Sequence, residues 1–128
     1  MKQKLNKPHS EQACTASLNA VGDALYVIGG KWKLRIIIAL SAGNKRFNEL
    51  QRTITGISAR VLSNELKQLE QNGFVKRIVH TESPVVVEYE LTNYSETLDK
   101  VLGSLREWGI MHKAKIKKEG REGGKKLS

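Results

Sequence analysis

Residues 56–74 read GISARVLSNELKQLEQNGF, and this stretch predicts one amphipathic helix at about 58–72 with clear ends. Ser58 is a good N-cap, because its hydroxyl can accept a hydrogen bond from a free amide of the first turn. Asn72-Gly73 marks the end, because glycine adopts the left-handed conformation that closes a helix. The apolar side chains collect on one side of the helical wheel, which predicts that this side packs against a core. They are Val61, Leu62, Leu66 and Leu69.

The opposite side of the same helix carries a polar set at i, i+3, i+4 and i+7: Arg60, Ser63, Asn64 and Lys67. Arginine matches the paired acceptors of guanine, and asparagine matches the donor and acceptor of adenine. Serine can contact a base or a phosphate, and lysine a phosphate. An ordinary solvent-exposed face is the alternative, since most helices have one. The pattern therefore makes this face a candidate nucleic-acid surface.

The segments before this helix predict a helix-turn-helix unit. Apolar residues recur at helical spacing over 16–28, and a second helix is expected over 31–41, with Trp32, Ile36, Ile37 and Leu40 inward. A short extended piece at 46–47 and a short helix through Ile54 follow. Thr55-Gly56 then forms a tight turn into helix 58–72. In such units the second helix lies in the DNA major groove, with its N-terminal residues at the bases.

After Gly73 the period changes from helix to strand. FVKRIVHT and PVVVEYEL flank a turn at 81–84, which predicts a two-stranded hairpin. Val85, Val87, Tyr89 and Leu91 would share its buried face. Thr92 is expected to cap a final helix over 93–112. The predicted fold is mainly α with a two-stranded β-hairpin wing, a winged helix-turn-helix.

Cations near the predicted helix and wing complete the candidate interface. Lys76, Arg77 and His80 on the hairpin could reach flanking phosphates, and Lys45 and Arg46 precede the short helix. The full set of candidate DNA-binding residues is Lys45, Arg46, Ser58, Arg60, Ser63, Asn64, Lys67, Lys76, Arg77 and His80.

The positive charge of the chain is concentrated at its two ends. The formal net charge is +9, of which residues 1–8 carry +3 and residues 113–128 carry +5. Basic ends suggest a polyanion or an acidic membrane surface, although they can also serve solubility alone. We expect a flexible arm over 1–12, one domain over 13–112 and a basic tail over 113–128, whose composition also fits disorder. Removal of the tail should weaken binding to all DNA alike.

Several classes of protein are disfavoured by what the sequence lacks. No apolar run approaches ~18 residues, the N-terminus has no secretory h-region, and no exposed helix is expected to pair a basic face with a large apolar one, so a cytoplasmic protein that binds no membrane is expected. One cysteine and three scattered histidines predict no internal disulfide and no metal site, and no cofactor is expected. No catalytic triad or phosphate-binding loop occurs, which disfavours an enzyme. An RNA-binding or adaptor module is the alternative, although surface aromatics for base stacking are few.

Four motifs in order resemble the HxlR-type winged helix-turn-helix transcriptional regulators. They are ALYVIGGKWKLRIIIAL after a cysteine, RFNELQRTITGISARVLSNELKQLEQNGFVKR, VEYELT and LREWG, spread over residues 14–112. The resemblance implies a homodimeric regulator of double-stranded DNA, with its dimer interface built from helices 16–28 and 93–112. The alternative is that these two helices close the core of one monomer. The family commonly carries a basic residue just before VEY, whereas this chain has valines after Pro84, so its wing tip offers no cation there.

Cys14 stands where the resemblance places a cysteine that some members use to sense oxidants or electrophiles. Such chemistry needs a thiolate, which a helix N-terminus or nearby cations favour. Lys31 and Lys33 are candidates for those cations. Because the chain has no second cysteine, Cys14 could form only an adduct, a mixed disulfide or a bond to a cysteine of a partner subunit. The alternative is a small buried apolar side chain.

Overall fold

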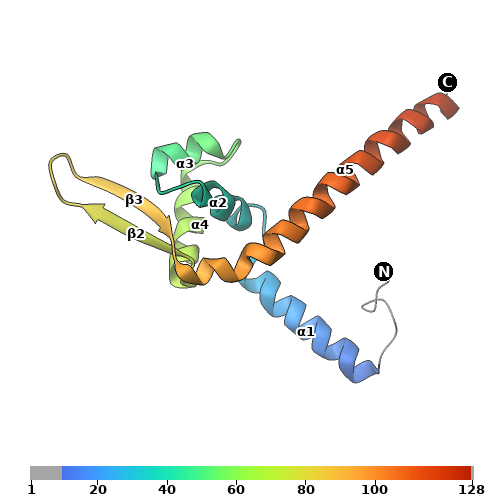
Figure 1. The fold of residues 1–128 in the computed structure, drawn as a ribbon, viewed down its shortest axis with the longest axis horizontal. Coiled ribbons are helices and arrows are strands. Elements are labelled where there is room, and N and C mark those ends of the chain that lie inside the picture. Colours follow the sequence, from blue (N-terminus) through green and yellow to red (C-terminus); the bar gives the residue numbers. More distant parts are fainter. Residues whose placement is uncertain (1–9, 128) are drawn as a thin grey trace.

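Two long helices project from a small winged core, as a ribbon of the computed structural model shows (Figure 1). The structure describes residues 10–127, with side chains through residue 121. The helices are α1 (Glu11–Ile28), α2 (Lys33–Ser41), α3 (Phe47–Thr53), α4 (Ala59–Gln71), the 3-10 helix η2 (Asn93–Leu98) and α5 (Asp99–Leu127). The strands are β1 (Lys45–Arg46), β2 (Val75–His80) and β3 (Val86–Leu91). The predicted winged helix-turn-helix is confirmed.

The wing is a three-stranded antiparallel sheet in the order β1-β3-β2. The predicted two-stranded hairpin is confirmed as β2 and β3, and the two-residue β1 adds a third, unpredicted strand along the free edge of β3, with Arg46 opposite Glu88. So short a strand has no periodicity for the sequence to display. The predicted face of β3 is less buried than expected. Val85 precedes the strand and is 65% exposed, while Val87, Tyr89 and Leu91 are half-buried. The hairpin extends beyond the core, so its tip has no core to pack against.

The core lies between α2, α3, α4 and the base of the wing. Its fully buried side chains include Ile36 and Ile37 of α2, as well as Leu50 of α3. The predicted inward face of α4 is confirmed for its three leucines, of which none is more than 1% exposed, and Val61 is half-buried against them. Burial of such side chains contributes about 1.5–3 kcal/mol each. This packing fixes which side of α4 faces outward.

An ion pair joins α2 to α4 beside this core. Lys33 Nζ lies 2.7 Å from Glu65 Oε1, and the two side chains are only 10% and 20% exposed. The lysine stands at the first residue of α2, within the motif GGKWK, and no local pattern pairs it with a residue 32 positions later. The pair sets the position of α4 along α2.

Two helices are longer in the structure than the sequence predicted. α1 begins at Glu11 rather than Ala16, because the Ser10 hydroxyl accepts from the Ala13 amide at 3.0 Å and caps it. Of the expected arm over 1–12, residues 1–9 lie outside the described residues, whereas Glu11 and Gln12 belong to α1. The final helix continues to Leu127 instead of ending near 112. Its apolar pattern stops near Ile116, so the sequence signal ended before the helix does.

The junction between wing and last helix also differs from the prediction. Thr92 occupies the N-cap position of η2 without a side-chain capping bond, and its hydroxyl donates instead to the Gly73 carbonyl at 2.5 Å. Gly73 itself closes α4 as predicted, with φ of +83°. The end of α4 and the start of the last helical segment are thus tied together at one point.

We predict that Lys33→Ala lowers the free energy of unfolding by about 3 kcal/mol, because it leaves the Glu65 carboxylate unpaired in a largely buried place. The double variant Lys33→Met/Glu65→Leu should recover most of that loss, since it removes both charges together. Urea unfolding at a fixed protein concentration measures both. A loss below about 1 kcal/mol for the single variant would mean that the pair behaves like an exposed one.

Candidate nucleic-acid interface

The helix-turn-helix is built from α3, a short turn and α4. Glu49 caps α3 by accepting from the Arg46 amide at 2.7 Å, and the Ile57 amide closes the turn onto the Ile54 carbonyl at 3.4 Å. Gly56 has φ of +89°, a value that a side chain would disfavour. The Ser58 hydroxyl accepts from the Val61 amide at 3.1 Å and starts α4 as predicted. α4 then runs for 13 residues, about 20 Å.

The polar face of α4 points away from the core. Arg60, Asn64 and Lys67 are exposed and Ser63 is half-buried. Glu65 is the one acidic residue between positions 58 and 67, and its carboxylate is directed to Lys33 rather than outward. The N-terminal two-thirds of α4 therefore presents hydrogen-bond donors and positive charge outward, while the Glu65 carboxylate is paired with Lys33. Such a surface suits the acceptors of a base edge or a phosphate.

The sheet divides its cations between two faces. Paired residues of an antiparallel sheet share a face, and neighbours along a strand alternate. Arg77 and Lys45 both pair with Tyr89 and lie on either side of it. Lys76 and His80 lie on the other face, as does Arg46, and Lys76 pairs with Glu90. The structure thus does not gather the five predicted sheet cations into one patch.

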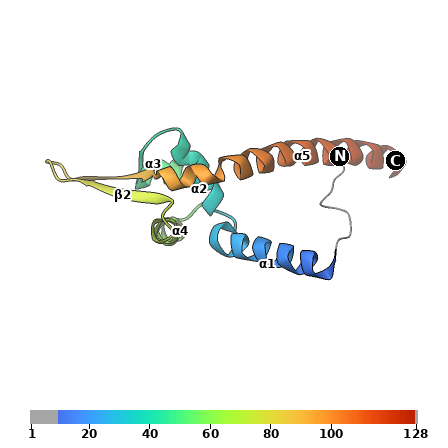
Figure 2. The same ribbon diagram turned by 60° about the horizontal axis from the view of Figure 1, so that its bottom comes forward.

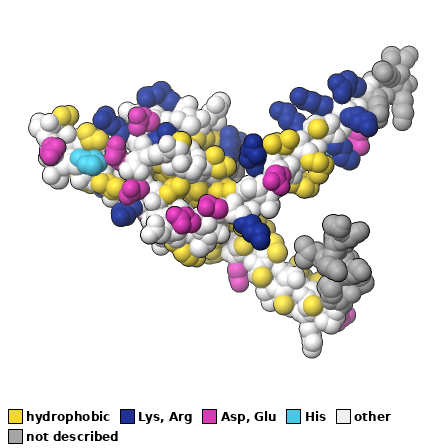
Figure 3. All heavy atoms as spheres, viewed as in Figure 1, with side chains coloured by type: hydrophobic (Ala, Val, Ile, Leu, Met, Phe, Trp, Pro, Cys, Tyr) yellow, Lys and Arg dark blue, Asp and Glu magenta, His cyan; other side chains and the backbone are white. Residues whose placement is uncertain are grey.

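The wing tip is poorly suited to phosphates. His80 Nε2 lies 3.0 Å from a Glu88 carboxylate oxygen, so the histidine has an acidic partner on its own sheet. In the space-filling view acidic atoms flank the histidine at the end of the wing (Figure 3). Val79 and Val85 are exposed there, at 43% and 65%. The wing tip lacks the basic residue that the family pattern offers, and the structure supplies no other in its place among the described side chains of the hairpin turn.

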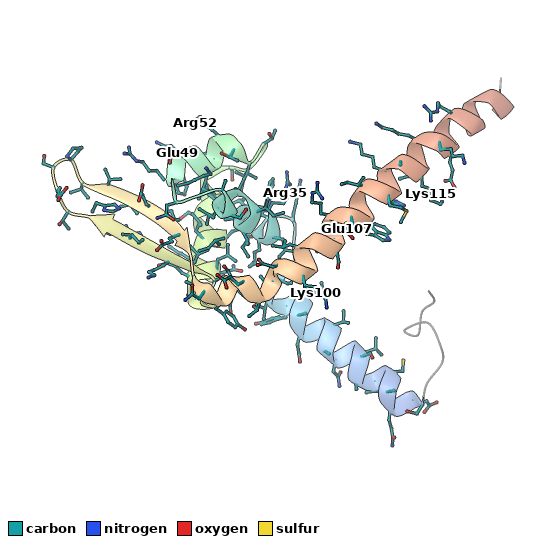
Figure 4. All side chains as sticks on the ribbon, viewed as in Figure 1. Arg35, Glu49, Arg52, Lys100, Glu107 and Lys115 are labelled. Atoms are coloured by element: carbon teal, nitrogen blue, oxygen red, sulfur yellow. The ribbon has the colours of Figure 1, made fainter. Side chains whose placement is uncertain are left out.

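A stack of charged side chains on Trp32 was not foreseen from the sequence. Lys31 Nζ lies 4.9 Å from the centre of the indole ring, and the Arg35 guanidinium carbon lies 4.8 Å from it. Arg35 projects from α2 toward the side from which α5 departs (Figure 4). The spacing K-W-K-x-R could have suggested cation–π contacts, because i, i+3 neighbours meet on a helix.

Cys14 is exposed near the start of α1, where its amide donates to the Ser10 carbonyl at 3.1 Å. The alternative of a buried apolar side chain is wrong within this chain. The expected approach of Lys31 and Lys33 is wrong as well, because both lie beyond the opposite end of α1 and Lys33 pairs with Glu65. What the structure keeps of the sensor hypothesis is an accessible thiol in the first turn of a helix.

Both projecting helices expose apolar side chains. α1 contributes no buried residue, and its Leu18, Val21 and Leu25 are 57–68% exposed. The suggestion that these helices close the core of one monomer is therefore wrong for most of both helices, although Val27 and Ile28 of α1 and Leu102 of α5 pack against the core. The exposed apolar residues of α5 are Val101, Leu105, Trp108, Ile110, Met111 and Ile116. In this one chain α5 pairs apolar and basic surface, so the sequence-based reason for setting membranes aside does not hold.

Comparison with known proteins gives this geometry a family. A sequence model of the HxlR-like helix-turn-helix family matches residues 27–117. The HTH-type transcriptional regulator YtcD of Bacillus subtilis is 42% identical over 93 residues, which are 73% of this chain and 74% of that protein. The YdeP regulator of the same organism is 39% identical over 98 residues, 77% of each chain.

Solved structures agree with the sequence relatives. The reduced form of the redox regulator HypR matches with a TM-score of 0.71 and 37% identity, over 77% of this chain and 98% of that one. The reduced form of the regulator YodB from B. subtilis matches with a TM-score of 0.63 and 40% identity, over 68% and 85%. The chain belongs to the HxlR-like helix-turn-helix family, and the predicted class, a winged helix-turn-helix DNA-binding transcriptional regulator, is confirmed.

We predict that this chain requires Arg60 for sequence discrimination. Arg60→Ala should weaken binding to a cognate duplex by about 1–3 kcal/mol and relax specificity at one base pair. The matched control is Arg52→Ala, an exposed arginine on α3 outside the polar face of α4 (Figure 4). Competition between cognate and random duplexes measures both. An equal loss on the two duplexes would make Arg60 a phosphate contact instead.

Proposed function

We propose that this regulator acts as a homodimer whose two α4 helices read two half-sites of double-stranded DNA. The polar face of α4 carries the proposal, since its donors point outward while its one nearby acid is held by Lys33. Arg60, Ser63, Asn64 and Lys67 would contact base edges or adjacent phosphates, with Ser58 at the helix start. The cations of the sheet would contribute less to DNA binding, because the sheet divides them between two faces. They are Lys45, Arg46, Lys76, Arg77 and His80.

A second copy of the chain accounts for the apolar surface of α1 and α5. Contiguous exposed apolar surface of this kind marks an interaction site. The two helices leave the core on the same side and diverge (Figure 2). Their large apolar side chains are mostly exposed in the single chain and are therefore open to a partner. A twofold arrangement uses the same surface on both subunits and would place the α4 helices about 34 Å apart or a multiple of it.

The protein's role would be binding rather than catalysis. The family it belongs to is one of transcriptional regulators, and the described residues contain no group of three or more His, Cys, Asp or Glu that could hold a metal ion. None of the helices described over 10–127 is long and apolar enough to cross a membrane. We propose that it works in the cytoplasm, on DNA and without a cofactor.

We further propose that Cys14 is the point at which oxidants or electrophiles control DNA binding. The thiol is exposed and lies in the first turn of α1, one of the two helices proposed to form the dimer. Solved relatives carry the names redox regulator HypR, in an oxidized form, and diamide-treated YodB. The thiolate would add to an electrophile and form a covalent adduct. Alternatively, the Cys14 thiol and a thiol of another molecule would together give two protons and two electrons to an oxidant such as diamide, which is reduced to its hydrazine, and the two sulfurs would form an intermolecular disulfide.

The dimer proposal predicts that Leu105→Glu converts the protein to monomers. A carboxylate at this 51%-exposed position would have to be desolvated in the interface. Lys100→Glu, which changes an already charged, exposed side chain near the start of the same helix, is the control and should leave the dimer intact. Sedimentation equilibrium measures the association. A dimer that survives Leu105→Glu unchanged would mean that α5 is not the contact.

The switch proposal predicts that diamide or a quinone releases the wild-type protein from DNA but leaves Cys14→Ser bound. The serine keeps the size and polarity of the side chain while removing the reactive sulfur. A gel shift before and after treatment, with reversal of the diamide effect by dithiothreitol, is the measurement. Equal release of both proteins would rule Cys14 out as the sensor.

A further inference from the structure

We propose that the distal part of α5, residues 113–121, is a second DNA-binding surface, independent of sequence, that binds the phosphate backbone of a duplex segment other than the one held by α4. This inference rests on the proposed function, because it assumes a molecule already bound to DNA through α4. It assigns a role to the part of α5 that neither the core nor the apolar stripe explains.

The charge of this segment is unbalanced and exposed. Its charged side chains are five cations and one acid, and all of them are exposed. One cation is engaged: Lys115 Nζ lies 2.7 Å from the Glu119 carboxylate, with both side chains 57% exposed. Lys113, Lys117 and Arg121 stand at i, i+4 and i+8, which places them along one face of the helix. That face is a row of positive charge about 12 Å long, with neighbouring cations about 6 Å apart along the helix axis, a length that spans several phosphates of one DNA strand.

The segment is a poor helix on its own. Like charges four residues apart destabilise a helix by a few tenths of a kcal/mol per pair, and Gly120 costs about 1 kcal/mol relative to alanine, as do Gly123 and Gly124 just beyond the segment. The apolar stripe of α5 ends at Ile116, so residues 117–121 have no apolar side chain to bury against a protein partner. A polyanion would remove the repulsion and favour the helical form in which the structure shows this segment.

The position of the segment separates it from the recognition helix. α5 leaves the core away from the wing, and its outer half carries most of the dark-blue surface on that arm (Figures 1 and 3). Residue 121 stands about 33 Å along the helix from its start at Asp99. The phosphates that it could reach therefore differ from those that flank α4 of the same subunit.

Duplex DNA fits this surface better than a membrane does. Binding to a lipid surface needs apolar side chains that insert beside the basic ones. Among residues 113–121 Ile116 is the one large apolar side chain, and residues 117–121 include none. The apolar side chains nearer the core, Val101 to Ile116, belong to the stripe proposed to face a second copy. A regulator that is bound to DNA through α4 already has duplex DNA nearby, so DNA is the polyanion that residues 113–121 would meet.

The test compares two double variants of the full-length chain that each remove two positive charges. Lys117→Gln/Arg121→Gln changes the distal segment, and Arg52→Gln/Lys100→Gln changes exposed cations elsewhere. Glutamine has nearly the helix propensity of lysine and arginine, so helix content should be preserved. A duplex that the full-length protein enriches from a random pool is immobilised and loaded with protein. Capture of a second, labelled random-sequence duplex is then measured.

Wild type and the control variant should capture the second duplex, and Lys117→Gln/Arg121→Gln should lose most of that capture while still binding the immobilised duplex. The slope of log affinity for random duplex against log salt should fall by about 1.8, two phosphate contacts at about 0.9 each. Undiminished capture by this variant would overturn the proposal. The proposal would also be overturned if the protein bound phosphatidylglycerol vesicles instead of the second duplex and this binding required Lys117 and Arg121. Failure of every protein to enrich a duplex from the pool would instead contradict the proposed function.

Discussion

The burial of three leucines on one side of α4 is the constraint on which the rest of the structure depends. Leu62, Leu66 and Leu69 are sealed against α2, α3 and the base of the wing, so the helix cannot rotate without exposing them. The Lys33–Glu65 pair then fixes α4 along α2 and removes its one nearby carboxylate from the outer face. The same packing therefore both stabilises the core and determines which side chains of α4 face outward, where we propose that they contact DNA.

The sequence predicted those parts of the molecule that local chemistry specifies. The ends of α4 follow from Ser58 and Gly73, and its two faces follow from a 3.6-residue period, so both could be derived from the residues alone. A short extended piece was predicted at 46–47, but its pairing with β3 was not, because that pairing depends on tertiary contacts that two residues cannot display. The distal half of α5 escaped prediction because charge and glycine conceal a helix whose apolar pattern has ended.

The candidate site shows the same division. The outward set on α4 is a property of one helix and was predictable, whereas the Lys33–Glu65 pair joins residues 32 positions apart and depends on tertiary packing. The separation of the wing cations onto two faces likewise depends on sheet register, and a one-residue change of register would invert it. The His80–Glu88 contact spans the hairpin and depends on the same register.

The shape of the molecule suggests a division of labour between its core and its arms. The core presents the outward polar face of α4, which we propose reads DNA. The helices α1 and α5 carry apolar surface that one chain leaves uncovered, and the far end of α5 carries excess positive charge. Cys14 lies on one of these arms rather than beside α4. A signal received there would have to act on the spacing of two α4 helices rather than on any single base contact, since a dimer reads its half-sites only at the right separation.

The most direct measurement is a crystal structure of the full-length chain with a duplex enriched from a random pool. Our expectation is that α4 lies in the major groove, with Arg60 and Asn64 within hydrogen-bonding distance of base edges and Glu65 still paired with Lys33. A complex in which the polar face of α4 is buried in a contact between subunits, or faces solvent while another element enters the groove, would contradict it.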